Sequence, residues 1–107
     1  MSDGPLYRAL LGFVCGRAGE RDKALAVLGE LTKMAKERFV PPVDFALIHA
    51  GLCDVEATFF WLEKAYQARA TRILELRSMY FECIRADARY ADLMRRIGLP
   101  LEPLLLG

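Results

Sequence analysis

The stretch Asp54–Tyr66, DVEATFFWLEKAY, carries the clearest helix signal in the chain and decides how the rest is interpreted. Its apolar side chains fall on two neighbouring lines at 3.6 residues per turn: Phe59, Leu62 and Tyr66, and beside them Thr58, Trp61 and Ala65. Asp54 precedes the first turn, where an N-cap is expected. So broad an apolar stripe predicts a helix covered on both sides, by one helix before it and one after it.

The composition limits the classes of protein to consider. A chain of 107 residues forms one domain, and 54% apolar with 27% charged residues is an ordinary globular composition. A net charge of +1 gives no electrostatic basis for binding nucleic acid or a membrane surface. No segment reaches the roughly 18 apolar residues of a membrane span, and the N-terminus does not resemble a signal peptide. A cytoplasmic protein is expected.

The cysteines support the same expectation. Cys15, Cys53 and Cys83 are odd in number, and their spacing matches neither a disulfide framework nor a metal site. The sequence therefore predicts free thiols, no metal and no cofactor. Cys15 and Cys83 lie on apolar faces and are interpreted as inert filling residues. Cys53, in a turn before a helix, keeps redox sensitivity as a minor alternative.

Local signals divide the chain into helices. We expect helices at 6–16, 20–38, 42–51, 54–68 and 88–97, with a short helix at 71–76 and a mixed stretch at 78–84. Pro41-Pro42 ends the second helix, Asp87 caps the last one, and Gly98-Leu99-Pro100 stops it. No strand-like alternation occurs. The sequence thus predicts an all-α fold of five to six helices.

A period of 34 residues relates the first half of the chain to the second. A shift by 34 aligns Leu11 with Phe45, Gly12 with Ala46, Cys15 with His49, Leu28 with Leu62, Gly19 with Cys53 and Glu20 with Asp54. A helix–turn–helix unit of this length is typical of tetratricopeptide repeats (TPRs), with the pattern W-x2-L-G-x2-Y, A-x3-F and P. The first copy resembles that pattern at Leu11-Gly12 and Ala24, and it departs at Arg8 and Cys15. The second copy departs at His49 and Thr58.

A narrower resemblance covers the second half. The segments 46–66 and 84–99 are similar to the C-terminal TPR block of bacterial signalling proteins, which follows cyclase, kinase or winged-helix domains. Leu52-Cys53-Asp54 stands where that family usually has L-G-D, and 85–90, RADARY, stands where it has R-x-D-P-R-F. The resemblance implies a binding role and brings no catalytic residue with it.

The resemblance implies a right-handed superhelix of about two and a half antiparallel hairpins in a single TPR-like domain, 1–107. The first hairpin is 5–38, the second is 41–69, and capping helices with the tail occupy 70–107. Small residues such as Gly12 and Ala46 are expected to let the two helices of one hairpin approach closely.

A concave groove is the main candidate site. In TPR stacks the first helix of each hairpin lines the inner curve, which here predicts an open strip of Leu6, Ala9, Phe13, Arg17, Val43, Leu47 and Ala50. The chain contains no Asn, so the mode in which Lys, Arg and Asn hold a C-terminal carboxylate is not expected. An apolar strip instead predicts an apolar peptide or amphipathic helix as ligand.

Four further features have two interpretations each. The cluster that contains Arg89, Arg95 and Arg96 is either a paired helical surface or a contact site for acidic partners. His49, the only histidine, is interpreted as a packed structural residue rather than a base. Trp61 is either core or a ligand anchor. The apolar tail, 99–107, either folds back or docks on another molecule.

The sequence favours a non-catalytic protein–protein interaction module or scaffold, with protein or peptide partners. The alternative is a homodimerisation module of a bacterial signalling protein. One histidine, two serines and no phosphate-binding loop make an enzyme or a small-molecule substrate unexpected. The near-zero net charge argues against an RNA-binding protein built from helical hairpins. Whether the chain is whole or part of a longer signalling protein stays open.

Overall fold

The computed structural model describes residues 4–69 and 79–98, and within these ranges it contains helices and no strand. The predicted all-α class is therefore confirmed. The elements, in chain order, are α1 (Pro5–Arg17), α2 (Arg21–Met34), α3 (Pro42–Gly51), α4 (Val55–Gln67), the short 3₁₀ helix η2 (Met79–Ile84) and α5 (Ala88–Ile97). No helix in the described part of the chain has both the length and the apolar character that a membrane crossing requires.

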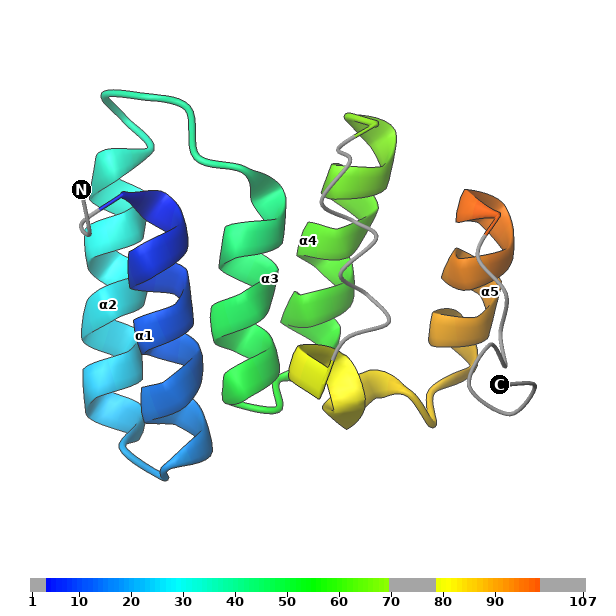
Figure 1. The fold of residues 1–107 in the computed structure, drawn as a ribbon, viewed down its shortest axis with the longest axis horizontal. Coiled ribbons are helices and arrows are strands. Elements are labelled where there is room, and N and C mark those ends of the chain that lie inside the picture. Colours follow the sequence, from blue (N-terminus) through cyan, green and yellow to red (C-terminus); the bar gives the residue numbers. More distant parts are fainter. Residues whose placement is uncertain (1–3, 70–78, 99–107) are drawn as a thin grey trace.

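The helices stand side by side in two antiparallel pairs followed by a single helix (Figure 1). α1 packs on α2 and also on α3, and α3 packs on α4. α5 lies beyond α4 and runs in the same direction as α4 (Figure 1). Because α1 and α3 make extensive contacts, the two hairpins meet mainly through their first helices.

α4 lies between α3 before it and α5 after it, as the sequence predicts for 54–66, but the most enclosed helix of the described part is α3 (Figure 1). Eight of the ten residues of α3 are buried. α4 buries one stripe, and its Phe60 is 55% exposed. The physical reason is that α3 is apolar apart from Asp44 and His49 and packs on α1, α4 and η2, so little of it faces solvent and a periodicity argument does not detect its position.

Most helix ends lie where local signals place them. α3 and α5 have the predicted limits, and the Asp54 and Asp87 side chains cap α4 and α5 by accepting hydrogen bonds from backbone N–H groups. α2 is shorter than predicted and ends at Met34, because the chain continues as a turn with tighter hydrogen bonds, such as Lys36 N–H to the Lys33 carbonyl. The predicted helix at 71–76 lies outside the described residues.

The 34-residue period is visible in the backbone of the two hairpin turns. Gly19 has φ +82° and Cys53, its counterpart, has φ +56°. The backbone hydrogen bonds repeat as well. In the first turn the N–H groups of Gly19 and Glu20 donate to the carbonyls of Gly16 (3.1 Å) and Cys15 (2.9 Å). In the second turn those of Cys53 and Asp54 donate to the carbonyls of Ala50 (3.0 Å) and His49 (3.0 Å). The shift that aligns the two sequences therefore also relates two turns of the same conformation.

Glycines set the close approach of α1 and α3. A Cβ atom on Gly51 would lie 2.6 Å from the Phe13 carbonyl oxygen, and one on Gly16 would lie 2.7 Å from the Gly51 backbone. Gly12 faces Ile48 of α3 rather than its own hairpin partner α2. The expectation that Gly12 acts within one hairpin was wrong, because the contact that leaves no room for a Cβ atom is the one between the hairpins.

Candidate interaction surface

The groove residues predicted from the sequence do come together, but they do not form an open strip. Ala9 and Phe13 of α1 and Val43, Leu47 and Ala50 of α3, here called the inner face, are all at most 9% exposed. This part of the prediction was wrong, since these side chains belong to the core of the described structure. Two of the seven predicted residues are exposed, and they are Leu6 and Arg17.

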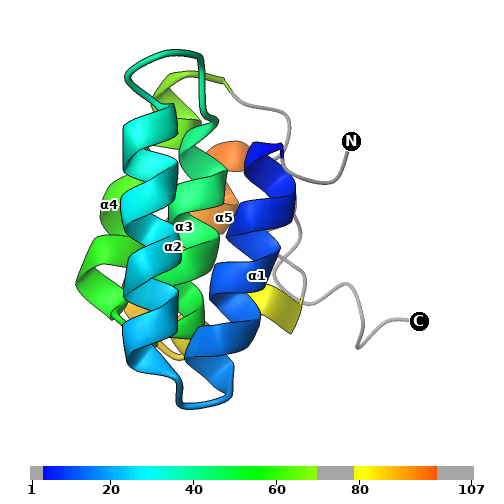
Figure 2. The same cartoon turned by 90° about the vertical axis from the view of Figure 1, so that its left-hand side faces the viewer.

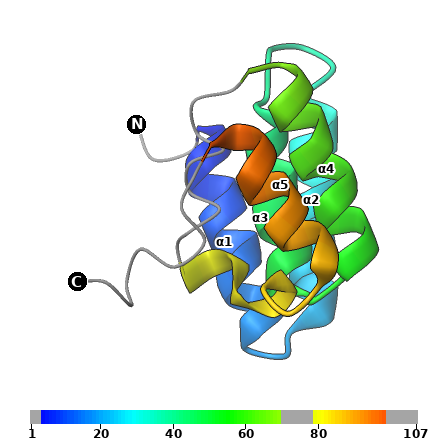
Figure 3. The same cartoon turned by 90° about the vertical axis from the view of Figure 1, so that its right-hand side faces the viewer.

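The short helix η2 contributes to the cover of this face. η2 packs on α3, and the Tyr80 ring meets the Phe13 ring edge-on at a centroid distance of 5.0 Å. Phe81 is completely buried in the same core cluster as Val43, Leu47 and Ala50 of the inner face. Figures 2 and 3 show η2 beside the C-terminal half of α1. Sequence reasoning missed η2, whose signal is an aromatic pair in a stretch without helical periodicity.

A disulfide joins Cys53 to Cys83 and ties η2 to the turn between α3 and α4, with Cα atoms 5.8 Å apart. The prediction of free thiols was wrong for this pair and holds for Cys15. The two cysteines are 30 residues apart, and the fold, rather than their spacing, brings them together. The guanidinium of Arg17 lies beside this bridge, with Nη1 3.7 Å from the Cys53 sulfur.

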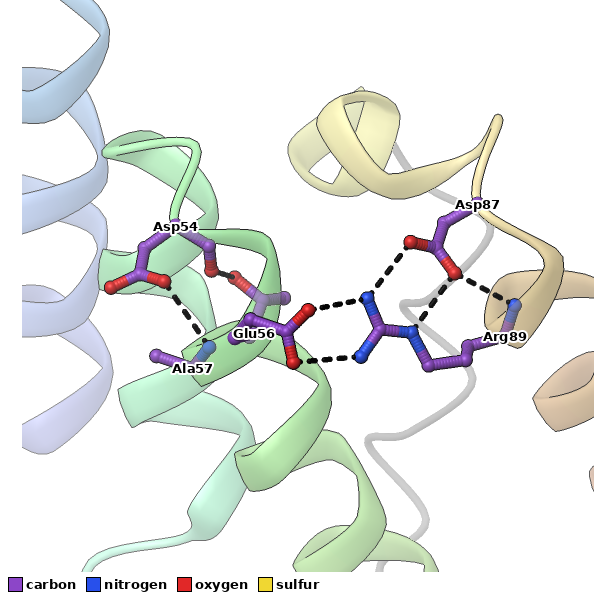
Figure 4. A network of polar contacts seen from close by, with 6 residues as sticks. Asp54, Glu56, Ala57, Asp87 and Arg89 are labelled. Atoms are coloured by element: carbon purple, nitrogen blue, oxygen red, sulfur yellow. Dashed lines mark hydrogen bonds and ion pairs between the residues drawn. The ribbon is translucent and has the colours of Figure 1, made fainter.

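Two of the arginines proposed as contacts for acidic partners are already paired within the molecule. Arg89 binds Glu56 of α4 through two hydrogen bonds of 2.9 Å and also binds Asp87 (Figure 4). Two helical turns further along, Arg96 makes the same kind of paired contact with Glu63 of α4. The interpretation as a paired surface therefore holds for both arginines.

Aromatic rings complete the two contacts between α4 and α5. The Arg89 guanidinium lies 4.7 Å from the centre of the Phe59 ring, and that of Arg96 lies 5.0 Å from the centre of the Tyr66 ring. Arg95 is 63% exposed and lies 4.0 Å from Asp92. Of the three arginines, Arg95 is the one that keeps most of its surface for a partner.

These ion pairs make the attachment of α5 sensitive to acid. Hydrogen bonds from Arg89 hold the pKa of Asp87 at about 2 and also lower the pKa of Glu56. Depressed carboxyl pKa values stabilise the fold above the unfolded pKa of about 4, and this contribution disappears as the pH falls towards 2. In urea titrations, wild type should exceed Arg89→Gln at pH 7, and the difference should close between about pH 4 and pH 2. A constant difference over that range would contradict the assignment.

His49 and Trp61 occupy structural positions. The His49 side chain is 14% exposed, and its Nδ1 atom lies 4.0 Å from Asp54. Burial lowers the pKa of His49, and the Asp54 charge opposes only part of that effect. Trp61 stacks on the Phe45 ring at a centroid distance of 4.3 Å. Both residues are therefore packed in the structure rather than arranged towards an open site.

Other apolar residues of α1 and α2 are exposed. Tyr7, Leu11 and Val14 lie at helical spacing along α1 and are 50%, 40% and 59% exposed, and Leu25 of α2 is 40% exposed. We call these four residues the end face. Figure 2 views the α1–α2 end of the molecule directly, with α1 and α2 foremost. The three residues of α1 share one face of the helix, and exposed apolar residues of this kind often belong to a contact surface.

Residues 4–69 and 79–98 contain no group of three metal-ligating side chains. An open hollow of about 440 Å³ between α1 and α2 is lined by side chains of mixed charge, Arg8, Glu30, Lys33, Met34, Glu37 and Arg38. Arg8 and Glu30 form an ion pair across it.

Comparisons with known proteins found no relative of this chain. No protein-family model, no curated protein and no solved structure matches this chain. The assignment of a role therefore depends on the geometry described above.

Proposed function

We propose that this chain is a non-catalytic interaction module built from TPR-like helical hairpins, and that its inner face binds an apolar peptide or amphipathic helix. The observation that carries the proposal is the position of η2. A short helical segment with two consecutive aromatic residues, Tyr80 and Phe81, already packs against α1 and α3. The fold thus contains an intramolecular example of the ligand class that we propose.

The repeat supports the same conclusion. Two hairpins with identical turn hydrogen bonds place α1 and α3 next to each other, as the first helices of a TPR stack would be. Helical repeats stack in this way and use the surface of the first helices for ligands. A partner helix with one or two aromatic residues on one face would replace η2.

The proposal predicts binding in trans. A labelled peptide with the sequence 79–98, with Ser in place of Cys83, should bind the full chain treated with dithiothreitol, with an apparent Kd on the order of 100 μM, because the tethered copy competes at millimolar effective concentration. A peptide with Ala at both Tyr80 and Phe81 should bind at least about tenfold more weakly. Fluorescence anisotropy measures both. Equal affinity of the two peptides would contradict the proposal.

Self-association is the second candidate function, and the end face favours it. A stripe of Tyr7, Leu11 and Val14 with Leu25 is suited to pairing two copies of the chain. If the end face forms the contact, Val14→Glu should abolish dimers in sedimentation velocity and leave helicity unchanged. If the apolar tail forms it, a chain that ends at Gly98 should lose dimers instead. A monomeric wild-type chain at high micromolar concentration would exclude this function.

A further inference from the structure

The cover of the inner face is secured by a covalent bond that chemistry can break. The Cys53–Cys83 disulfide links η2, whose Tyr80 ring contacts Phe13, to the turn at the start of α4. The buried side chains of Phe81 and Ile84 also hold η2, but the element itself is short. It has six residues, and Phe81 has non-helical backbone angles within it (φ −112°, ψ 22°). A 3₁₀ segment of this length has little stability of its own.

The bridge is placed where a reductant can reach it. Cys53 is exposed and Cys83 is partly exposed. Arg17, which is also exposed, places its guanidinium 3.7 Å from the Cys53 sulfur. A neighbouring cation stabilises a thiolate, and a thiolate that is stabilised leaves faster in thiol–disulfide exchange. The surroundings therefore favour Cys53 as the leaving group.

We propose that the Cys53–Cys83 disulfide is a redox-cleavable tether that holds η2 against the inner face, and that its reduction by a dithiol frees η2 and opens this face. This inference rests on the proposed function for its biological meaning, since the opened face is the one proposed to bind a helix. The partner class is then an apolar or aromatic helix that binds the reduced protein and is excluded from the oxidised one.

Reduction by the dithiol proceeds through two thiol–disulfide exchange steps. One thiolate of the dithiol attacks the Cys83 sulfur, the Cys53–Cys83 bond breaks, and Cys53 leaves as a thiolate beside Arg17. The second sulfur of the dithiol, as a thiolate, then attacks the first dithiol sulfur, the bond between that sulfur and Cys83 breaks, and Cys83 is released. Two electrons pass from the dithiol to the protein disulfide. The dithiol becomes a cyclic disulfide, and its two protons end on Cys53 and Cys83.

Cys15 provides the internal comparison. It belongs to α1 and is a free thiol. Its backbone carbonyl accepts a hydrogen bond from Glu20 in the first hairpin turn, and no disulfide is attached to that turn. The equivalent position in that turn, Gly19, has the positive φ that Cys53 also has. Cys53→Gly therefore removes the bridge and at the same time supplies the residue that best tolerates this backbone conformation.

Hydrogen–deuterium exchange of the full chain tests the tether directly. After reduction with dithiothreitol, amides of η2 should exchange roughly ten- to a hundredfold faster than in the oxidised protein, because the bridge no longer restricts local opening. The exchange rates of amides in α2 should be the same before and after reduction. Cys53→Gly and Cys83→Ser should show the fast exchange under both conditions, and Cys15→Ser should behave like wild type.

The result separates this inference from the proposed function. Unchanged exchange in η2, with two additional thiols titrated after reduction, would overturn the tether whatever the chain binds. Faster exchange without any binding of the 79–98 peptide would support the tether and overturn the binding role. Faster exchange with peptide binding that requires reduction is the result expected if both hold.

Discussion

Gly51→Ala should destabilise the protein by about 3 kcal/mol, which corresponds to a fall in Tm of roughly 15 °C for a domain of this size. The added methyl group would lie 2.6 Å from the Phe13 carbonyl oxygen and 2.8 Å from the Phe13 Cα atom. Both contacts are with backbone, so no side chain can rotate away. The helices α1 and α3 would have to separate along their whole contact, and thermal unfolding followed by circular dichroism measures the cost.

Gly29→Ala is the matched control for this substitution. Gly29 also lies within a helix, α2, but it is exposed and nothing lies within 4 Å of an added Cβ atom. Alanine there should stabilise the protein by about 0.5–1 kcal/mol, through helix propensity alone. If both variants change stability in the same direction, the close contact of α1 and α3 is not present in solution.

Phe81→Ala should cost about 3–5 kcal/mol, the range found when a buried aromatic side chain is truncated. Phe81 is completely buried, and it belongs to the same core cluster as Val43 and Leu47. The measurement is urea unfolding of the oxidised protein, so that the disulfide is present in both chains. Phe39→Ala, at a position that is 78% exposed, should stay within about 0.5 kcal/mol of wild type. A loss below about 1 kcal/mol at Phe81 would show that η2 does not pack on the hairpins.

Features coded by neighbouring residues could be predicted from the sequence. Pro42 opens α3, Asp87 caps α5, and Gly98 ends α5 with φ +89°, each because a local backbone preference acts within a few residues. The equivalence of Gly19 and Cys53 could be predicted for the same reason, since both turns depend on a short run of residues. The all-α class followed from these local signals together.

Features set by contacts between distant residues could not be predicted. Which helix is central depends on what surrounds α3, and its nearly uniform apolar character does not reveal its neighbours. The pairing of Cys53 with Cys83, and that of Arg89 with Glu56, joins residues 30 and 33 positions apart. The repeat brings the inner-face residues together as predicted, but it does not reveal their burial, which arises from the packing of α3 on α1, α4 and η2.

The most direct test of the account is to locate where a helix binds. The reduced full chain, with 13C-labelled methyl groups on Ala, Val and Leu, is titrated with the unlabelled 79–98 peptide and followed by NMR. The account predicts saturable shift changes at the methyl groups of Val43, Leu47 and Ala50, with no change at Leu25 of the end face. Changes confined to Leu11, Val14 and Leu25, or no changes at all, would contradict it.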